Sequence, residues 1–388
     1  MPAASTPDAE HLIVIQPTPF CNIDCSYCYL HDRAVSSRMS AQTLGAVLDA
    51  VFQSRRLGHR ITFVWHAGEP LTAGRAFFEH AFAETARRAA LGPKRHISHS
   101  IQTNGLLLDA RWLELFRRYQ VQLGLSIDGP KFLHDRHRKT RDGRGTHAAA
   151  MRAVKLLEME GYPFSALMVV TREALAHADA IYDFFCTTGA RSLGLNVEES
   201  EGAHASSSLA DRRLDAEVRA FWRRLLQRQR RNPPGLPIRE FGRFGRLLQP
   251  GTRIEPRSMR VDNDSVRPFA IVSFDVNGRV GVFCPELLGA PSPRFGDFVL
   301  GHIGDVRIDE VLDSARGQLL AREIAAGVER CRRECSYFAF CGGGQPANKF
   351  FEHGRFDVTE TAYCRTHEQR VVDAVIDQLE EEAPAPVT

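Results

Sequence analysis

The first half of the chain alternates short apolar segments with longer amphipathic ones, and this alternation restricts the possible folds more than any other feature. Each expected strand except the last is followed by a segment with helical periodicity. The expected strands are Leu12–Gln16, Ile61–His66, Ile97–Thr103, Val121–Ile127, Phe164–Val170 and Ser192–Val197. The expected helices are Ser40–Arg56, Arg75–Ala90, Arg111–Tyr119, Thr146–Glu160 and Ala176–Thr188. This series predicts a parallel sheet with right-handed crossovers, and periodicity alone allows either a doubly wound sheet or a barrel.

Three cysteines follow the first expected strand on one short loop. Cys21, Cys25 and Cys28 (the cysteine triad) have the spacing Cx3Cx2C. Soft thiolates select iron–sulfur or zinc sites, and a closed site of either kind needs four ligands. Because no fourth local ligand is present, the triad predicts a cubane cluster with one iron open to a substrate or cofactor. The alternative is a zinc knuckle that takes its fourth ligand from elsewhere in the chain.

Composition is that of an ordinary globular protein, with 43% hydrophobic and 25% charged residues, and a length of 388 residues suggests about two domains. The net charge of +3 does not argue for nucleic-acid binding. No segment approaches the ~18 apolar residues of a membrane span, and no signal peptide is recognisable at the N-terminus. We therefore expect a cytoplasmic protein whose nine cysteines serve as metal ligands in a reducing compartment.

Polar motifs follow the next three expected strands, at the ends where sites of parallel α/β folds lie. The motifs are Trp65-His66-Ala67-Gly68-Glu69-Pro70, Gln102-Thr103-Asn104-Gly105 and Ser126-Ile127-Asp128-Gly129-Pro130, and the last is followed by His134-Asp-Arg-His-Arg138. Each run alone is also good turn or cap chemistry. Their order after successive strands favours one common site.

A second group of cysteines follows an expected β-hairpin. Ala270–Phe274 and Arg279–Phe283 are predicted to pair around an Asn-Gly turn. Downstream, four further cysteines (the auxiliary cysteines) predict a full cubane site, with tetrahedral zinc as the alternative. They are Cys331, Cys335, Cys341 and Cys364. Cys186 is expected to be an inert buried thiol.

The cysteine triad, with Tyr27 before its last member, and the Gly68-Glu69-Pro70 run resemble the radical S-adenosylmethionine (radical SAM) superfamily. The hairpin and auxiliary cysteines resemble its SPASM extension. The resemblance implies a partial (β/α)6 barrel with a C-terminal SPASM/twitch-like cluster-binding extension. The implied division is a barrel over 1–200, a helical connector over 201–265 and an auxiliary iron–sulfur domain over 266–388.

The resemblance also implies two [4Fe-4S] clusters and bound SAM. The triad would hold the SAM-cleaving cluster, and the auxiliary cysteines the second. The residues expected to bind or line the SAM site are Tyr27, Gly68, Glu69, Asn104, Ser126, Asp128 and Arg138. The chain departs from the SPASM pattern because Gln345 replaces a cysteine and no cysteine lies between Cys186 and Cys284. Cys284 is therefore the expected remnant of a lost cluster.

Several local runs look like maturases of glycine-rich-repeat peptides, which form three-residue cyclophanes. These runs are Ile15-Gln-Pro-Thr18, Phe63–Pro70, His134–Arg138, Gly194–Glu199, Arg239–Phe241 and Cys284–Gly289. The implied partners are a ribosomal precursor peptide and a flavodoxin- or ferredoxin-type reductant. The implied reaction joins a side-chain Cβ to an aromatic ring through a 5′-deoxyadenosyl radical, with Glu198, Glu199 or Glu286 as candidate base. The alternatives are an anaerobic sulfatase-maturating, formylglycine-forming enzyme and a non-catalytic peptide-binding protein.

The middle of the chain contains one more amphipathic helix. Its apolar stripe, from Leu214 to Leu225, is expected to be core. The nearby arginines are expected to form a solvated face, with a docking surface for an acidic peptide as the alternative. They are Arg223, Arg224, Arg228, Arg230 and Arg231. A linker is expected at Asn232–Pro237.

Overall fold

A curved sheet runs through the centre of the protein in the computed structural model, which describes residues 10–92, 94–231, 235–245 and 263–382. Its strand order is β11-β10-β9-β1-β3-β4-β5-β7-β8. The barrel strands are β1 (Glu10–Ile15), β3 (Arg60–Trp65), β4 (His96–Thr103), β5 (Gln122–Ser126), β7 (Phe164–Val170) and β8 (Leu193–Val197). Neighbours among these six pair in parallel.

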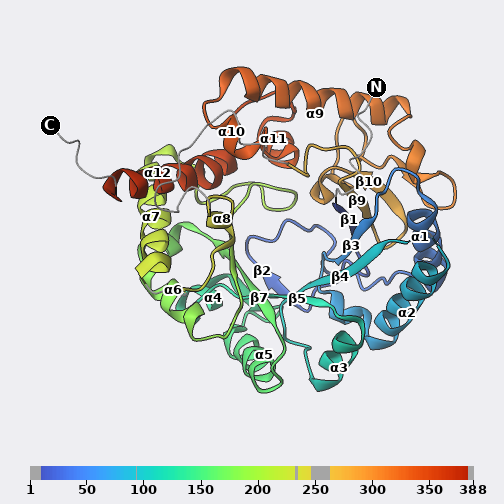
Figure 1. The fold of residues 1–388 in the computed structure, drawn as a ribbon, viewed down its shortest axis with the longest axis horizontal. Coiled ribbons are helices and arrows are strands. Elements are labelled where there is room, and N and C mark those ends of the chain that lie inside the picture. The colour runs from blue at the N-terminus through green and yellow to red at the C-terminus, as the bar shows by residue number, and fades with distance from the viewer. Residues whose placement is uncertain (1–9, 93, 232–234, 246–262, 383–388) are drawn as a thin grey trace.

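Helices follow one another around the outside of these strands (Figure 1). They are α1 (Ala41–Gln53), α2 (Arg75–Leu91), α3 (Ala110–Tyr119), α5 (His147–Met159) and α6 (Ala178–Cys186). The first begins where predicted, because the Ser40 side chain accepts a hydrogen bond from the Thr43 amide, and it buries Leu44, Val47, Leu48 and Val51 against the sheet. All six predicted strands and five predicted helices are present, within a few residues at their ends. The partial, open (β/α)6 barrel is therefore confirmed.

The predicted hairpin is present but does not stand apart from the barrel. Strands β9 (Ile271–Phe274) and β10 (Arg279–Val282) are antiparallel, and β9 pairs in parallel with β1 from Leu12↔Ile271 to Ile15↔Phe274. The short β11 (Gly301–His302) pairs with β10 at the sheet edge. The hairpin thus extends the barrel sheet beside the strand that leads into the cysteine triad.

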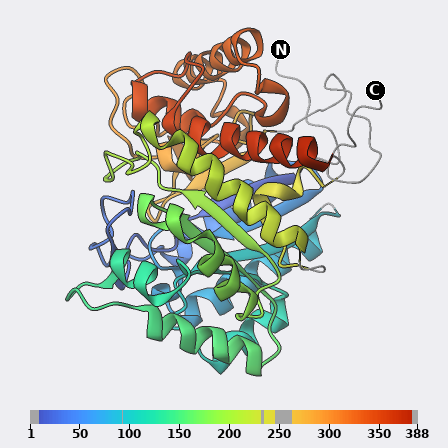
Figure 2. The same cartoon turned by 90° about the vertical axis from the view of Figure 1, so that its left-hand side faces the viewer.

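The C-terminal part forms helices that lie across the open side of the ring in Figure 1. They are α9 (Ala315–Glu334), α10 (Phe338–Cys341), α11 (Pro346–His353), the single-turn segment η7 (Cys364–Gln369) and α12 (Arg370–Glu382). Helix α12 packs beside α7 (Asp215–Arg231), as Figure 2 also shows. The apolar stripe of α7 is buried with Val371, Val372 and Val375 of α12, which confirms its predicted core role.

Shorter elements complete the described part of the chain. They are β2 (Ile23–Cys25), β6 (Arg138–Thr140), α4 (Lys131–His137), α8 (Arg239–Gly242), η1 (Pro70–Ala73), η2 (Arg172–His177), η3 (Arg212–Leu214), η5 (Pro285–Leu287) and η6 (Ile308–Glu310). None of the described helices is both long and apolar enough to cross a membrane. The expected linker begins at residues 232–234, which lie outside the described residues, and so do residues 246–262 of the expected connector.

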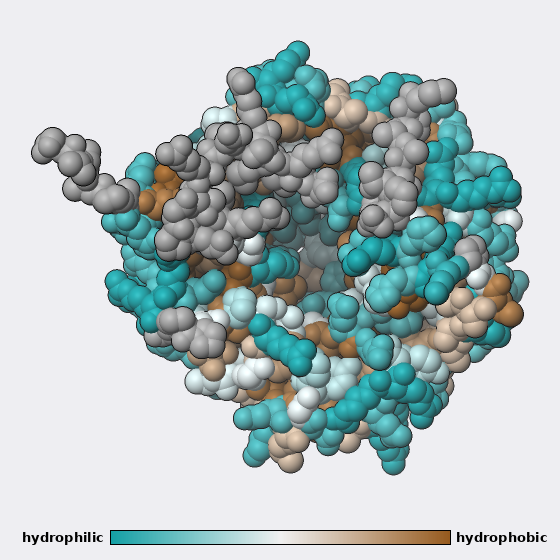
Figure 3. Space-filling view, viewed as in Figure 1, coloured by the Kyte–Doolittle hydropathy of each residue, from teal (hydrophilic) through white to brown (hydrophobic). Residues whose placement is uncertain are grey.

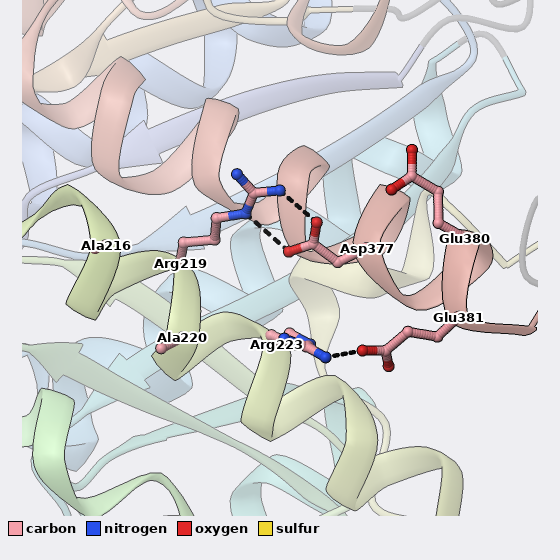
Figure 4. Close-up of a pocket in the computed structure, with 7 residues that line it drawn as sticks. All are labelled: Ala216, Arg219, Ala220, Arg223, Asp377, Glu380 and Glu381. Carbon is pink, nitrogen blue, oxygen red and sulfur yellow. Dashed lines mark hydrogen bonds and ion pairs between the residues drawn. The ribbon is translucent and has the colours of Figure 1, made fainter.

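Five of the six arginines of α7 form ion pairs within the molecule, which favours the solvated face over the docking surface. Figure 4 shows the groove between α7 and α12, where Arg219 and Arg223 reach Asp377 and Glu381. On the other side of the helix, Arg224 Nε lies 2.8 Å from Asp179 Oδ1. Arg228 contacts both Asp179 and Asp183, and Arg230 reaches Glu382 at 2.7 Å. Each of these exposed ion pairs contributes little to stability, but together they neutralise the arginines to which an acidic leader peptide would have to bind.

Candidate active site

A cavity of about 570 Å³ opens at the carboxyl ends of β1, β3 and β9. Its wall includes Gln16 after β1, His66 and Ala67 after β3, and Tyr29 from the end of the cysteine loop. The hairpin side contributes Glu286. Figure 3 shows that the face viewed in Figure 1 is hollowed near its centre, with mostly hydrophilic side chains around the hollow. Barrel and extension therefore both line this cavity.

The cysteine triad is held by a two-stranded ribbon that the sequence did not reveal, because each strand has only three residues. Strand β2 pairs with β6, so that Cys25 lies opposite Arg138. The Ser26 amide donates to the His137 carbonyl at 3.1 Å, and the Cys28 amide donates to the Cys25 carbonyl at 3.2 Å. The ribbon fixes the loop onto the segment that follows β5.

The thiols of Cys21 and Cys25 have pKa values raised by their surroundings. The pKa of Cys21 is raised to about 12, chiefly by burial, and the charges of nearby Glu69 and Cys28 act in the same direction. Burial likewise raises the pKa of Cys25 to about 12, with Cys21 and Cys28 acting in the same direction. Such thiols lose their protons readily only to a cation that the sulfurs bind directly. The thiols of the triad are therefore better suited to bind a metal cluster than to exist as free thiolates.

The turn after β3 packs tightly against the start of the cysteine loop. Ala67 and Gly68 both have positive φ, of 71° and 67°. A Cβ on Gly68 would lie 2.6–2.7 Å from the carbonyl oxygens of Thr18, Pro19 and Phe20. Only glycine fits at this position, whereas Ala67, which stands where the superfamily motif has glycine, occupies the left-handed region at some conformational cost.

Glu69 is 1% exposed and is surrounded by hydrogen-bond donors at the end of β4. Its carboxylate accepts from the Thr103 hydroxyl at 2.7 Å, the Asn104 amide at 2.8 Å and the Leu71 amide at 3.1 Å. Burial nevertheless raises the pKa of Glu69 to about 6. Neighbouring Asn104 donates through its side chain to Asn22 Oδ1 at 2.7 Å, which ties the end of β4 to the cysteine loop.

Three of the residues expected in the SAM site form a buried group of their own. The Tyr27 hydroxyl donates to Asp128 Oδ2, and Arg138 Nε lies 3.0 Å from the same oxygen. The Arg138 guanidinium also lies over the Tyr27 ring, 5.6 Å from its centroid. Burial acts to raise the pKa of Asp128, but Arg138 and His134 outweigh it and the pKa is lowered. Ser126 lies nearby and accepts from Gln102 at 2.7 Å.

The candidate bases differ in what they contact. Glu198 is used within its own loop, because it accepts from the Ser208 amide at 2.7 Å and pairs with His204 Nε2 at 2.9 Å. Glu199 is hydrogen-bonded to Glu201, an acid that sequence reasoning missed. The amide of Asn348 donates to both, at 2.6 and 3.1 Å.

This acid pair, Glu199 and Glu201, lies close to Glu286 in the cavity wall. The pKa of Glu199 is raised to about 7, chiefly by burial; the Asn348 amide opposes this shift, and the charge of Glu286 acts in the same direction as burial. Burial and the neighbouring Glu199 and Glu286 raise the pKa of Glu201 well above its usual value. The pKa of Glu286 is also raised by burial. The group is therefore able to accept a proton near neutral pH.

The auxiliary cysteines come together between α9, α10 and η7. Burial raises the pKa of Cys364, and the charges of the other three auxiliary cysteines act in the same direction. Lys349, which is 4% exposed, places its Nζ 3.3 Å from Cys331 Sγ. A buried ammonium needs an anionic partner, so this lysine fits a sulfur that carries negative charge, as a cluster ligand does.

The remaining two cysteines lie apart from both sets. Cys284 is buried with its Sγ 4.0 Å from Gln345 Oε1, the residue that stands where the SPASM pattern has cysteine. Cys186 is exposed, so its predicted burial is wrong. It follows Phe185 on α6, and the buried face of that helix is Ala178, Ile181, Tyr182 and Phe185, which turns Cys186 outward.

Across the described ranges, no three or more histidine, cysteine, aspartate or glutamate side chains are arranged to hold a single metal ion. Because the protein ligands of a cluster lie farther apart than those of one ion, this finding concerns single metal ions and does not test cluster binding. The assignment of both cysteine sets as cluster ligands stays a prediction, and so does the assignment of the SAM-site residues.

Comparison with known proteins connects this geometry to a family. The model of the radical SAM superfamily matches residues 15–185. The uncharacterized protein sll1766 of Synechocystis sp. is 39% identical over 373 residues, which cover 96% of this chain and 92% of that protein. The serine-type anaerobic sulfatase-maturating enzyme of Klebsiella aerogenes is 39% identical over 208 residues, or 52% of this chain. That match spans only about half (51%) of the relative's length.

Solved structures share the fold over most of the chain. Native anSMEcpe with bound AdoMet and Cp18Cys peptide superimposes with a TM-score of 0.74 at 22% identity, covering 96% of this chain and 98% of that one. Streptococcus suis SuiB bound to precursor peptide SuiA gives a TM-score of 0.63 at 14% identity, covering 92% and 76%. Residues 15–185 therefore form a radical SAM domain, and this domain together with the sulfatase-maturating relatives indicates that the protein is an enzyme.

Proposed function

We propose that this enzyme installs a carbon–carbon crosslink between a side-chain Cβ and an aromatic ring in a ribosomally made precursor peptide. The observation that carries the choice is the contact between Cys284 and Gln345. A further auxiliary cluster bound at these two positions would need a thiolate at each, and Gln345 cannot supply one. Only the triad and the auxiliary cysteines then remain as cluster ligands. The alternative, sulfatase maturation, belongs to a family that retains both auxiliary clusters.

When bound, the first cluster and SAM would supply a radical that removes hydrogen from an unactivated C–H bond, and the second cluster would supply a one-electron acceptor. The protein's part is to position the groups and exclude water. Gly68 and Glu69 would hold the SAM amino group. Asn104 and Asp128 would line the SAM pocket, and Ser126 and Arg138 would contact the ribose or carboxylate of SAM. The contacts of Tyr27 with Asp128 and Arg138 would also keep the cysteine loop in place beside that pocket.

The acid group beside the cavity would complete the crosslink. The Cβ–H bond is broken, the Cβ–ring bond forms, and the ring must then lose one proton and one electron to become aromatic again. The acid pair and Glu286 would take the proton, because burial raises the pKa of each carboxyl and brings that of Glu199 to about 7. Glu198 is a weaker candidate, since Ser208 and His204 already occupy its carboxylate.

A peptide substrate is supported by the solved neighbours, which are bound to the Cp18Cys peptide in one case and to precursor peptide SuiA in the other. We further propose a flavodoxin- or ferredoxin-type reductant and a cytoplasmic location, where oxygen-sensitive clusters persist. The non-catalytic alternative is set aside, because the radical SAM domain and the sulfatase-maturating relatives indicate an enzyme.

Sulfatase maturation is the second candidate function, favoured by the 39% identity to the Klebsiella aerogenes enzyme over 208 residues. Co-expression with the short peptide encoded beside this gene, followed by fragmentation mass spectrometry, separates the two. Both reactions remove two hydrogens when the formylglycine is made from serine. In a crosslinked peptide the two lost hydrogens come from an aromatic residue and its crosslinked partner, and the segment between these two residues yields no fragment ions. A loss confined to one serine or cysteine would refute the proposal.

A further inference from the structure

Lys349 is a buried cation with an unusual set of partners. It belongs to α11, and its ammonium donates to the Gly327 carbonyl at 3.4 Å and contacts Cys331 Sγ at 3.3 Å. Within the described residues, no carboxylate forms an ion pair with it. A carbonyl alone does not offset the desolvation of an ammonium, so the sulfur is the group that balances this charge.

The slot that holds this lysine is formed by glycines. A Cβ on Gly327 of α9 would lie 3.3 Å from the lysine Nζ, and a Cβ on Gly344 would lie 3.6 Å from its Cε. Gly342, Gly343 and Gly344 all have positive φ, which folds the chain after Cys341 back toward the lysine. The lysine side chain therefore packs directly against the backbone of Gly327 and Gly344 on its way to Cys331.

The acids near the auxiliary cysteines are paired elsewhere. Glu368, whose charge raises the pKa of Cys341 and Cys364, lies 2.5 Å from Arg243 and 2.9 Å from His367. Glu360, which acts on Cys335, is paired with Arg212. Among the residues that the structure describes, Lys349 is thus the cation in direct contact with a cysteine of this set.

We propose that Lys349 raises the reduction potential of the auxiliary cluster and so makes it an electron acceptor. The inference rests on the proposed second cluster. Reduction adds one negative charge to a cluster, and a buried ammonium beside a ligand sulfur stabilises the reduced form more than the oxidised form. Hydrogen bonds to ligand sulfurs are an established means of shifting such potentials. Lys349 would exert this effect through the sulfur of Cys331 and would not contact the substrate.

The test isolates the auxiliary cluster in the full chain by replacing the cysteine triad with alanine. An electron paramagnetic resonance redox titration then compares Lys349 with Lys349→Gln, Lys349→Met and Lys349→Arg. The two neutral variants should shift the oxidised-to-reduced ratio at a fixed potential at least tenfold toward oxidised, a lowering of 59 mV for a one-electron couple. The arginine variant should stay near the parent value. Arg332→Gln is the matched control, since Arg332 follows Cys331 but its side chain is 60% exposed.

Each other outcome counts against the inference. An unchanged potential in the neutral variants, with about four irons still bound, would overturn it and leave the proposed function standing. Loss of iron from both neutral variants but not from Lys349→Arg would also overturn it, because the charge would then serve cluster loading. A parent chain that binds no iron once the triad is removed would refute the second cluster itself.

Discussion

Gly68→Ala should be far more damaging than an alanine at another glycine with the same backbone conformation. Gly68 and Gly189 have φ of 67° and 69°, so alanine at either position costs about 1–2 kcal/mol for the left-handed conformation. A Cβ at Gly189 meets nothing within 4 Å, whereas at Gly68 it meets three backbone carbonyls at 2.6–2.7 Å. Such overpacking adds about 1–3 kcal/mol. We therefore expect a loss of about 2–5 kcal/mol for Gly68→Ala against 1–2 for Gly189→Ala.

The clash also has a functional consequence, because the three carbonyls belong to residues 18–20, immediately before Cys21. Relief of the clash would move the cysteine loop, so Gly68→Ala should lose most SAM cleavage while Gly189→Ala retains it. Urea unfolding of both variants beside the parent measures the first effect, and 5′-deoxyadenosine production measures the second. Equal destabilisation of the two variants, with SAM cleavage intact in both, would show that the close approach at Gly68 is unimportant.

Three further outcomes are expected. Replacing the cysteine triad with alanine should abolish SAM cleavage, while circular dichroism shows a folded barrel, since the triad lies on a loop; unchanged 5′-deoxyadenosine production would refute the radical SAM site. The loaded chain should contain about eight irons, and Cys284→Ser should leave that number unaltered; a count near twelve that falls in this variant would mean a third cluster on Cys284. Glu199 has a pKa raised to about 7 in the folded chain, so the folded state holds an extra proton and stability is lost as pH rises from about 4.5 to about 7. Glu199→Gln should therefore gain stability relative to the parent across that range in urea titrations, and a constant difference would contradict the raised pKa.

The strands and helices of the barrel followed from the sequence because their information is local, whereas the choice of a barrel over a doubly wound sheet came from the family resemblance. Each strand is a short apolar run and each helix carries its own apolar stripe, so periodicity located both without knowledge of their neighbours. The cysteine triad was equally readable, since its three ligands lie within eight residues of one another. Caps such as Ser40, which accepts from the amide of Thr43, also depend on only a few residues.

The tertiary structure alone decided which distant residues meet. The pairing of β9 with β1 joins residues about 260 positions apart, and no pattern within either strand specifies that partner. The same holds for Glu201, which becomes a neighbour of Asn348 only when the loop after β8 meets α11. Lys349 was not singled out from the sequence, because its contact with Cys331 arises only when α11 meets α9. Spacing reveals groups that act within one turn or loop, whereas burial and charge pairing depend on how separate elements pack.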